Sequence, residues 1–389
     1  MGQKEAPKKA FFVEPEYMIG RIVPNYVNRF PQSDLQHALS LSLGTMKLDS
    51  NNKWSKCYNH PQTGVQLFYS YLGNNRIFGH QFSALTYISL NVFNRAKKPY
   101  YLKMGLGAAY FTTYYDSITN RRNLNVGSPF AWAFQASAYK TLTEKNGLNL
   151  KAGLVFSHAS NGHTTLPNYG TNSLLISFAA QFYNKKHETY QICSNRKLNR
   201  ENRIRNYIIG AHQGFGFHEY GDKDGPVGGD KKAVYSSSIF VGKVYNSHFR
   251  LNTGLTYRYY EVYQQQIESR NLTKFMDNPK WSSSNLVAFI GGEYYMGHVG
   301  LEAELGINVY KPFYKQFEDD FPLNVQFKGY MQFKSYFKRL FSTRLGLNFY
   351  LINANKMPKH NFFAGPHIKA NAGQADFTEI VFGYQYLIK

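Results

Sequence analysis

The sequence predicts an all-β protein, a transmembrane antiparallel up-and-down β-barrel with about 12–16 strands. Segments of roughly 10 to 16 residues alternate apolar and polar side chains and are separated by turn residues, as in transmembrane barrels. The 32 tyrosines and 31 phenylalanines bring the aromatic content to 17%, and aromatic side chains favour strands and membrane interfaces. No stretch approaches the roughly 18 apolar residues that a transmembrane helix requires, so the chain can span a membrane only as a closed barrel.

The alternating segments define the expected strands. They are 12–22, 36–47, 62–72, 79–94, 99–115, 128–143, 147–160, 170–183, 203–217, 232–245, 247–262, 282–296, 298–311, 323–337, 340–353, 361–370 and 376–388. Their number is odd, whereas single-chain bacterial barrels have an even number of strands. At least one segment is therefore not a strand, and 12–22 is the weakest. Long connections such as 161–171 alternate with tight turns such as 144–146, which is typical of extracellular loops and periplasmic turns.

The chain is expected to divide into four parts. They are an N-terminal tail at 1–11, barrel strands that carry the candidate site at 12–185, a polar periplasmic connection at 186–201 and additional barrel strands at 202–389. The residues after Met1 lack the apolar core of a signal peptide, so we expect an export signal to have been removed. Cys57 and Cys193 have no metal-ligand spacing. Both cysteines fall on the expected periplasmic side. They could form a disulfide there or remain as two free thiols, and the sequence leaves both alternatives open.

The net charge of +21 indicates an anionic partner. The densest basic run, 197–205, is interrupted by asparagines and by Glu201, and the other basic residues are scattered through strands and turns. This distribution does not favour nucleic acid as a partner. Attraction to an anionic surface such as phosphorylated lipid fits it better.

One hairpin carries polar residues on a face that is otherwise apolar. Side chains two apart in a strand share a face, which groups Leu148, Leu150, Ala152, Leu154, Phe156, His158 and Ser160. In the next strand the same period groups Asn172, Leu174, Ile176, Phe178, Ala180 and Phe182. Both faces are apolar apart from their residues beside the loop, so both are expected to face lipid. The hairpin therefore brings His158, Ser160 and Asn172 together at one rim, outside the barrel wall.

These three residue types suit acyl transfer. A hydroxyl becomes a nucleophile when a neighbouring imidazole takes its proton, and the oxygen of a carboxamide can orient that imidazole. Donors for an oxyanion are also needed, and the candidates are the side chain of Asn161 or Asn168 and backbone N–H groups near Gly162. The alternative is that His, Ser and Asn simply decorate a membrane rim.

The window 153–173 resembles the lipid A 3-O-deacylase (PagL-like) family. His158, Ser160 and Asn161 form its His-x-Ser-Asn pattern, and Pro-Asn-x-Gly follows at 167–170. The resemblance implies an outer-membrane barrel that removes an ester-linked acyl chain from lipid A, with Ser160 as nucleophile, His158 as base, Asn168 as oxyanion donor and Asn161 as a supporting residue. Its acidic triad member falls at Asn172, which cannot offset the imidazolium charge as a carboxylate would.

The expected function is thus an outer-membrane esterase acting on lipid A (lipopolysaccharide), with no metal or cofactor. One alternative is a non-enzymatic barrel, either a pore or an accessory subunit of a larger assembly, that keeps a relic of the motif. The second is another lipid enzyme, such as a phospholipase or acyltransferase. The resemblance does not explain the residues after about 190. Protein partners that bind through the C-terminal half therefore remain an alternative.

Other polar residues give weaker signals. His163 follows the motif and is expected to be solvated, with a role in phosphate binding as the alternative. His212 lies within an expected strand, and His218 and Glu219 follow its end, but their spacing alone does not define a metal site. The acidic run 318–320 is expected to be an exposed turn rather than a Ca²⁺ site.

Overall fold

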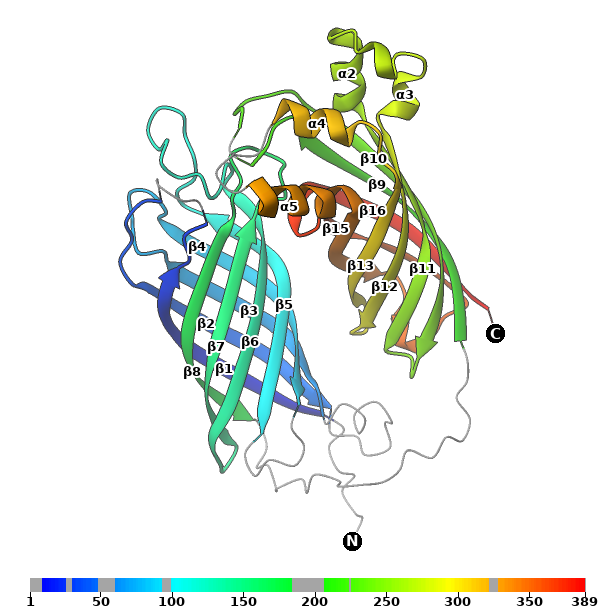
Figure 1. Cartoon of the computed structure of the whole chain (residues 1–389). Coiled ribbons are helices and arrows are strands. Elements are labelled where there is room, and N and C mark those ends of the chain that lie inside the picture. The colour runs from blue at the N-terminus through cyan, green and yellow to red at the C-terminus, as the bar shows by residue number, and fades with distance from the viewer. Residues whose placement is uncertain are drawn as a thin grey trace. The chain divides into compact units, whose positions relative to one another are not determined.

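The computed structural model describes residues 9–25, 30–47, 60–92, 99–183, 206–223, 225–321 and 328–388. The chain forms two compact units. The first comprises Met1–Asn161 and Asn168–Glu201, and the second comprises Gly162–Pro167 and Asn202–Lys389. Each unit contains one closed antiparallel barrel of eight strands (Figure 1).

The first barrel contains strands β1 to β8. They are β1 (Lys9–Ile22), β2 (Gln36–Lys47), β3 (Gln62–Tyr71), β4 (His80–Asn91), β5 (Tyr100–Phe111), β6 (Phe130–Lys145), β7 (Leu148–Ser160) and β8 (Thr171–Tyr183). Each strand pairs with its neighbour in sequence, and β1 also pairs with β8. This last pairing closes the barrel and leaves no sheet edge.

The second barrel contains strands β9 to β16. They are β9 (Asn206–Glu219), β10 (Lys231–Tyr245), β11 (Phe249–Tyr260), β12 (Ser284–Tyr295), β13 (Val299–Tyr310), β14 (Phe341–Tyr350), β15 (His360–Asn371) and β16 (Gln374–Ile388). Pairing of β9 with β16 closes it.

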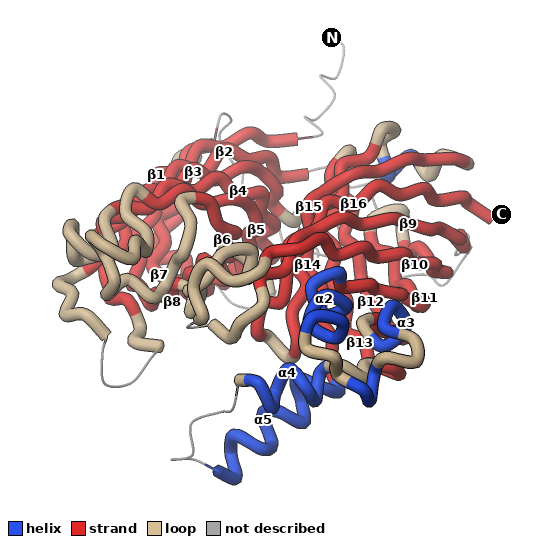
Figure 2. Tube along the Cα trace, turned by 90° about the horizontal axis from the view of Figure 1, so that it is seen from above, coloured by secondary structure: helices blue, strands red, loops and turns tan. Residues whose placement is uncertain are grey.

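Short helices occupy the connections of the second barrel. They are α2 (Glu261–Ser269), η1 (Thr273–Phe275), α3 (Pro279–Ser282), α4 (Tyr314–Asp320), α5 (Lys328–Leu340) and η3 (Ala354–Lys356). Figures 1 and 2 show α2, α3 and α4 together at one end of this barrel. In the described part of the chain, no helix is both long and apolar enough to cross a membrane.

Side chains alternate between the two faces of the strands as the period of two predicts. On β8, Leu174, Ile176 and Phe178 point outward and are more than half exposed, whereas Ser173 and Ser177 point inward and are buried. An apolar outer face and a polar interior are typical of transmembrane barrels. The prediction of an all-β antiparallel barrel is confirmed.

The structure differs from the prediction in the number of barrels and in one of the expected strands. The sixteen strands close into two barrels rather than one. Segment 12–22, the weakest expectation, is a strand within β1. The false strand is 323–337, because 328–340 form helix α5, in which Phe333 and Phe337 lie one turn apart with ring centroids at 4.4 Å. Cys57, Cys193 and the expected connection at 186–201 lie outside the described residues.

Two glutamates of β1 organise the interior of the first barrel. Lys103 from β5 and Lys151 from β7 both form ion pairs with Glu14. Glu16 accepts hydrogen bonds from Tyr139 at 2.8 Å and from Ser40 at 2.9 Å. Because buried charges need partners, these pairs across the interior hold the wall strands at a fixed separation.

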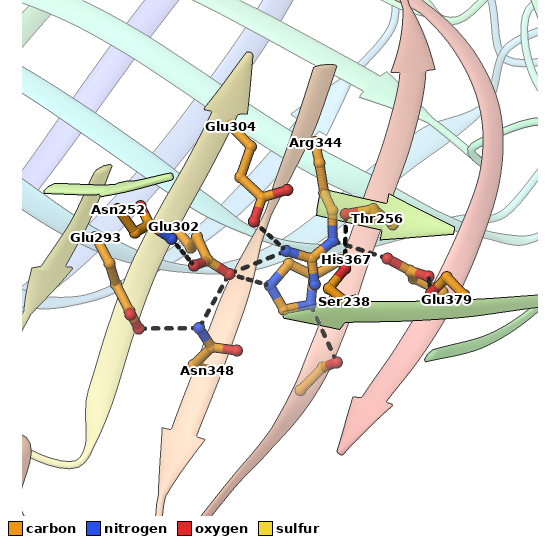
Figure 3. A network of polar contacts seen from close by, with 12 residues as sticks. Ser238, Asn252, Thr256, Glu293, Glu302, Glu304, Arg344, Asn348, His367 and Glu379 are labelled. Atoms are coloured by element: carbon orange, nitrogen blue, oxygen red, sulfur yellow. Dashed lines mark hydrogen bonds and ion pairs between the residues drawn. The ribbon is translucent and has the colours of Figure 1, made fainter. Parts of the chain in front are cut away.

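The second barrel encloses a larger ionic network (Figure 3). Arg344 of β14 lies 3.0 Å from Glu302, 3.1 Å from Glu304 and 2.8 Å from Glu379. Glu302 also pairs with Arg250 of β11 at 2.9 Å. The interior of an eight-stranded barrel is just wide enough for side chains to fill, and here charged side chains of opposite sign fill it.

Replacement of Arg344 by alanine is expected to destabilise the second barrel strongly. Glu302, Glu304 and Glu379 would lose a shared cation while still buried, and breaking a buried ion pair costs about 3–5 kcal/mol. Arg270→Ala is the matched control, because Arg270 pairs with Asp320 outside the barrel interior and is 38% exposed, where a pair contributes about 0–1 kcal/mol. Urea unfolding of the refolded protein in lipid vesicles measures both losses, and equal losses would contradict this account.

Candidate functional site

The β7–β8 hairpin brings His158 and Asn172 together on the outer face of the first barrel. The two residues are direct partners in the antiparallel register. Their neighbours Ser157 and Ser173, which also pair, point inward and are buried. His158 is therefore an outward residue at the loop end of β7, where the period of two places it.

A hydrogen bond joins His158 to Asn172. The Nδ1 atom of His158 lies 2.7 Å from Oδ1 of Asn172. A carboxamide oxygen only accepts hydrogen bonds, so this contact selects the tautomer in which Nδ1 carries the proton and donates it to Asn172. The Nε2 atom is then left with its lone pair, which is the state that a general base requires.

Ser160 occupies the next outward position on β7 and bonds to Asn168. The Nδ2 atom of Asn168 donates to Oγ of Ser160 at 2.9 Å, and Oδ1 of Asn168 lies 3.1 Å from the same Oγ. The backbone N–H of Asn161 also donates to Oδ1 of Asn168, at 3.2 Å. This third bond fixes the amide so that its N–H group points at Ser160. Asn161 therefore contributes through its backbone.

Gly170 packs against both His158 and Ser160. Its φ of +75° lies in the left-handed region that favours glycine. A Cβ atom there would come within 2.8 Å of Cε1 of His158 and 3.5 Å of Cβ of Ser160. The backbone N–H of Gly170 donates to the carbonyl of Asn125 at 2.8 Å. Gly170 is part of the sequence pattern at 167–170, and the structure adds its close packing against the candidate residues.

The outer wall beside the site is aromatic and aliphatic. In the register of β6 with β7, Trp132 is the partner of Ser160 and Phe134 is the partner of His158. Leu154 and Phe156 on β7 continue the outward face and are exposed, as are Leu174 and Ile176 on β8. An apolar surface of this kind suits a hydrocarbon chain.

Gly162 has a different position from the other candidates. It begins the segment Gly162–Pro167, which belongs to the second unit. It adopts a φ of +70°, and a Cβ atom there would lie 2.2 Å from Oγ1 of Thr378. The geometry thus groups His158 with Asn172 and Ser160 with Asn168 and Asn161, whereas Gly162 packs against β16.

Two of the weaker expectations are corrected by the structure. His163, which was expected to be solvated, is buried and stacks on His218. His212 lies within a strand, β9, as expected, and its ring contacts Phe240 and Phe363. The acidic turn is part of helix α4, where Asp320 binds Arg270. Among the described residues, no group of three His, Cys, Asp or Glu side chains is placed to hold a metal ion.

The arrangement has the parts needed for acyl transfer. An imidazole with a free Nε2 and a hydroxyl occupy successive outward positions of one strand, and an amide N–H group lies at the hydroxyl. A general base, a nucleophile and an oxyanion donor are the groups that ester cleavage through an acyl intermediate uses.

Comparison with known proteins gives a family match over part of the chain. Residues 41–181 match the family model of lipid A 3-O-deacylase (PagL). The crystal structure of the outer membrane enzyme PagL aligns at 17% identity over 43% of this chain and 97% of that chain, with a TM-score of 0.31. The outer membrane protein opdK from Pseudomonas aeruginosa aligns at 10% identity over 98% of each chain, with a TM-score of 0.21. No curated protein matches the chain. The resemblance that the window 153–173 predicts is therefore confirmed as a match to the lipid A 3-O-deacylase (PagL) family model over residues 41–181.

Proposed function

We propose that this protein is an esterase of the bacterial outer membrane that removes an ester-linked acyl chain from lipid A. The observation that carries the proposal is the 2.7 Å hydrogen bond between His158 and Asn172 on the outward face, with Ser160 at the next outward position of the same strand. The family match over residues 41–181 supports the choice of lipid A as substrate.

The substrate reaches the site within the membrane. Lipid A of the outer leaflet moves laterally against the wall of the first barrel. One acyl chain lies along the exposed side chains of Leu154, Phe156 and Leu174, while the sugar and its phosphates stay at the rim, in contact with water. No charged group of the substrate then has to enter the hydrocarbon, which would be costly.

The first step forms an acyl-enzyme. The Oγ atom of Ser160 attacks the ester carbonyl carbon while Nε2 of His158 takes the hydroxyl proton. The oxyanion that forms accepts a hydrogen bond from Nδ2 of Asn168, which already lies 2.9 Å from the attacking oxygen. The bond to the sugar oxygen then breaks, and His158 returns its proton to the leaving alcohol.

The second step releases the fatty acid. A water molecule gives a proton to Nε2 of His158 and attacks the acyl carbonyl. The bond to Ser160 breaks, and the proton passes back to its Oγ atom. Throughout both steps the hydrogen bond from Nδ1 of His158 to Asn172 keeps the imidazole in one orientation and one tautomer.

The interiors of the barrels argue against the pore alternative. Buried charged and polar side chains from different strands meet inside each barrel, as Glu14 meets Lys103 in the first and Arg344 meets Glu379 in the second. Such an interior is a packed core rather than an aqueous channel. Analysis of the lipid products distinguishes the two remaining alternatives. An accessory subunit would release no fatty acid, and a different lipid esterase would act on another lipid.

Ser160→Ala is expected to abolish deacylation. Cells that express the protein should contain lipid A lighter by one hydroxyacyl chain, and cells that express Ser160→Ala should not. Ser157→Ala is the matched control, because Ser157 lies on the same strand but points inward and is buried, so its lipid A should match that of the unaltered protein. Mass spectrometry of extracted lipid A measures this. Unchanged acylation with the unaltered protein, or a loss that persists in Ser160→Ala, would overturn the proposal.

Asn172→Asp is expected to raise kcat about tenfold. A carboxylate would keep the contact with Nδ1 of His158 and would stabilise the imidazolium, and a hydrogen bond to a charged acceptor is stronger by about 1–1.5 kcal/mol, which is about tenfold in rate. Asn172→Leu should instead lower kcat by an order of magnitude or more, because the imidazole loses its orienting partner. Initial rates on purified lipid A in detergent test both, and equal rates for the two variants would exclude this role for Asn172.

A further inference from the structure

The segment 168–170 directly precedes β8 and lies outside the pairing of β8 with β7. It nevertheless carries two parts of the candidate site. The amide of Asn168 donates to Oγ of Ser160 at 2.9 Å, and Gly170 packs against the imidazole of His158. Because the strand pairing does not reach this segment, other contacts must set its position.

Those contacts pair all four backbone polar groups of Tyr169 and Gly170. The N–H of Tyr169 donates to the carbonyl of Leu124 at 3.1 Å, and that of Gly170 donates to the carbonyl of Asn125 at 2.8 Å. The Nδ2 atom of Asn25 donates to both of the carbonyl oxygens, to that of Tyr169 at 3.0 Å and also to that of Gly170. Every one of these partners belongs to the first unit.

Asn25 is carried by the chain that continues from β1. The backbone N–H of Val23 donates to the carbonyl of Asn172 at 2.8 Å, so this stretch runs beside the start of β8. The Oδ1 atom of Asn25 is buried, and it has no hydrogen-bond partner in the part of the chain that the structure describes. Asn25 therefore acts on the segment through its NH₂ group, which supplies two donors.

The loop on the other side of the segment is held by Asn123. This side chain is 1% exposed. Its Nδ2 atom donates to the carbonyl of Ile77 at 2.8 Å, and its Oδ1 atom accepts the N–H of Asn125 at 3.2 Å. Asn123 thus ties the loop before β6 to the loop after β3. The carbonyls that receive the N–H groups of 169 and 170 consequently have a fixed position in the first unit.

We propose that Asn25 is a positioning residue of the lipid A esterase site. It holds the backbone of Tyr169 and Gly170 against the loop 123–125, so that the amide of Asn168 points at Ser160 before substrate binds. A displacement of about 1 Å at a catalytic group can lower a rate about a hundredfold. The positioning depends only on contacts within the first unit, and its catalytic consequence rests on the proposed function.

Asn25→Leu tests the proposal. Leucine keeps roughly the size of the side chain but has no donor for the two carbonyl oxygens. Hydrogen exchange measured by mass spectrometry should show about a tenfold loss of protection in peptides that cover 168–172. On lipid A in detergent, kcat should fall about tenfold. KM should stay within about twofold, because the apolar wall that receives the acyl chain is unchanged.

Asn308→Leu is the matched control. The Nδ2 atom of Asn308 also donates to two successive backbone carbonyls, that of Arg339 at 2.9 Å and that of Leu340 at 3.3 Å. Its Oδ1 atom, like that of Asn25, is buried without a hydrogen-bond partner among the residues described. Asn308 lies in the second unit, so exchange at 168–172 and kcat should match those of the unaltered protein. Equal losses of kcat in the two variants would overturn the proposal.

The two readouts separate this proposal from the proposed function. If Asn25→Leu does not fold, Asn123→Ala provides the same two measurements from the other side of the segment. Unchanged protection of 168–172 in the folded variant overturns the positioning, and lost protection with unchanged kcat overturns its catalytic consequence. Failure of the proposed function has a different signature, in which the unaltered protein and Ser160→Ala leave lipid A equally acylated while protection of 168–172 is still lost in Asn25→Leu.

Discussion

Closure of the backbone hydrogen bonds is the constraint on which the rest of this structure depends. A strand in hydrocarbon has no water to satisfy its N–H and C=O groups, so every strand needs two partners and the sheet must close. The pairing of β1 with β8 and of β9 with β16 provides this. Closure also fixes which side chains face lipid, because alternate residues of each strand point to opposite sides. A polar side chain on the outward face is costly in hydrocarbon unless it lies near a rim, and His158 and Ser160 lie at the loop end of β7.

Much of this architecture follows from the sequence because it depends on local periodicity. The outward placement of His158 and Asn172 needs only the period of two and a hairpin between adjacent strands. The site pattern at 158–170 was likewise visible as a string of residues. Helix α5 was not recognised, because its aromatic residues, such as Phe333 and Phe337, suit a strand as well as a helix.

The division into two barrels was not predicted because periodicity does not state which strands close a sheet. The signal lies in the inward residues. Glu14 finds its cations within the first eight strands, at Lys103 and Lys151, and Arg344 finds its carboxylates within the last eight. A sixteen-stranded barrel would surround water, and its inward charges would not need partners across the interior. Complementary inward charges within each half of the chain therefore indicate two narrow barrels.

The same limit explains why His163 was misjudged. A histidine in a polar loop next to glycine and threonine reads as solvated, and nothing local reveals that its ring stacks on His218, more than fifty residues later. The window that carries the site is continuous in sequence but contributes to two units, since Asn161 and Asn168 belong to the first and the six residues between them to the second. Within the first unit, the β7–β8 register alone makes His158 and Asn172 partners, which is why these two residues could be placed from the sequence.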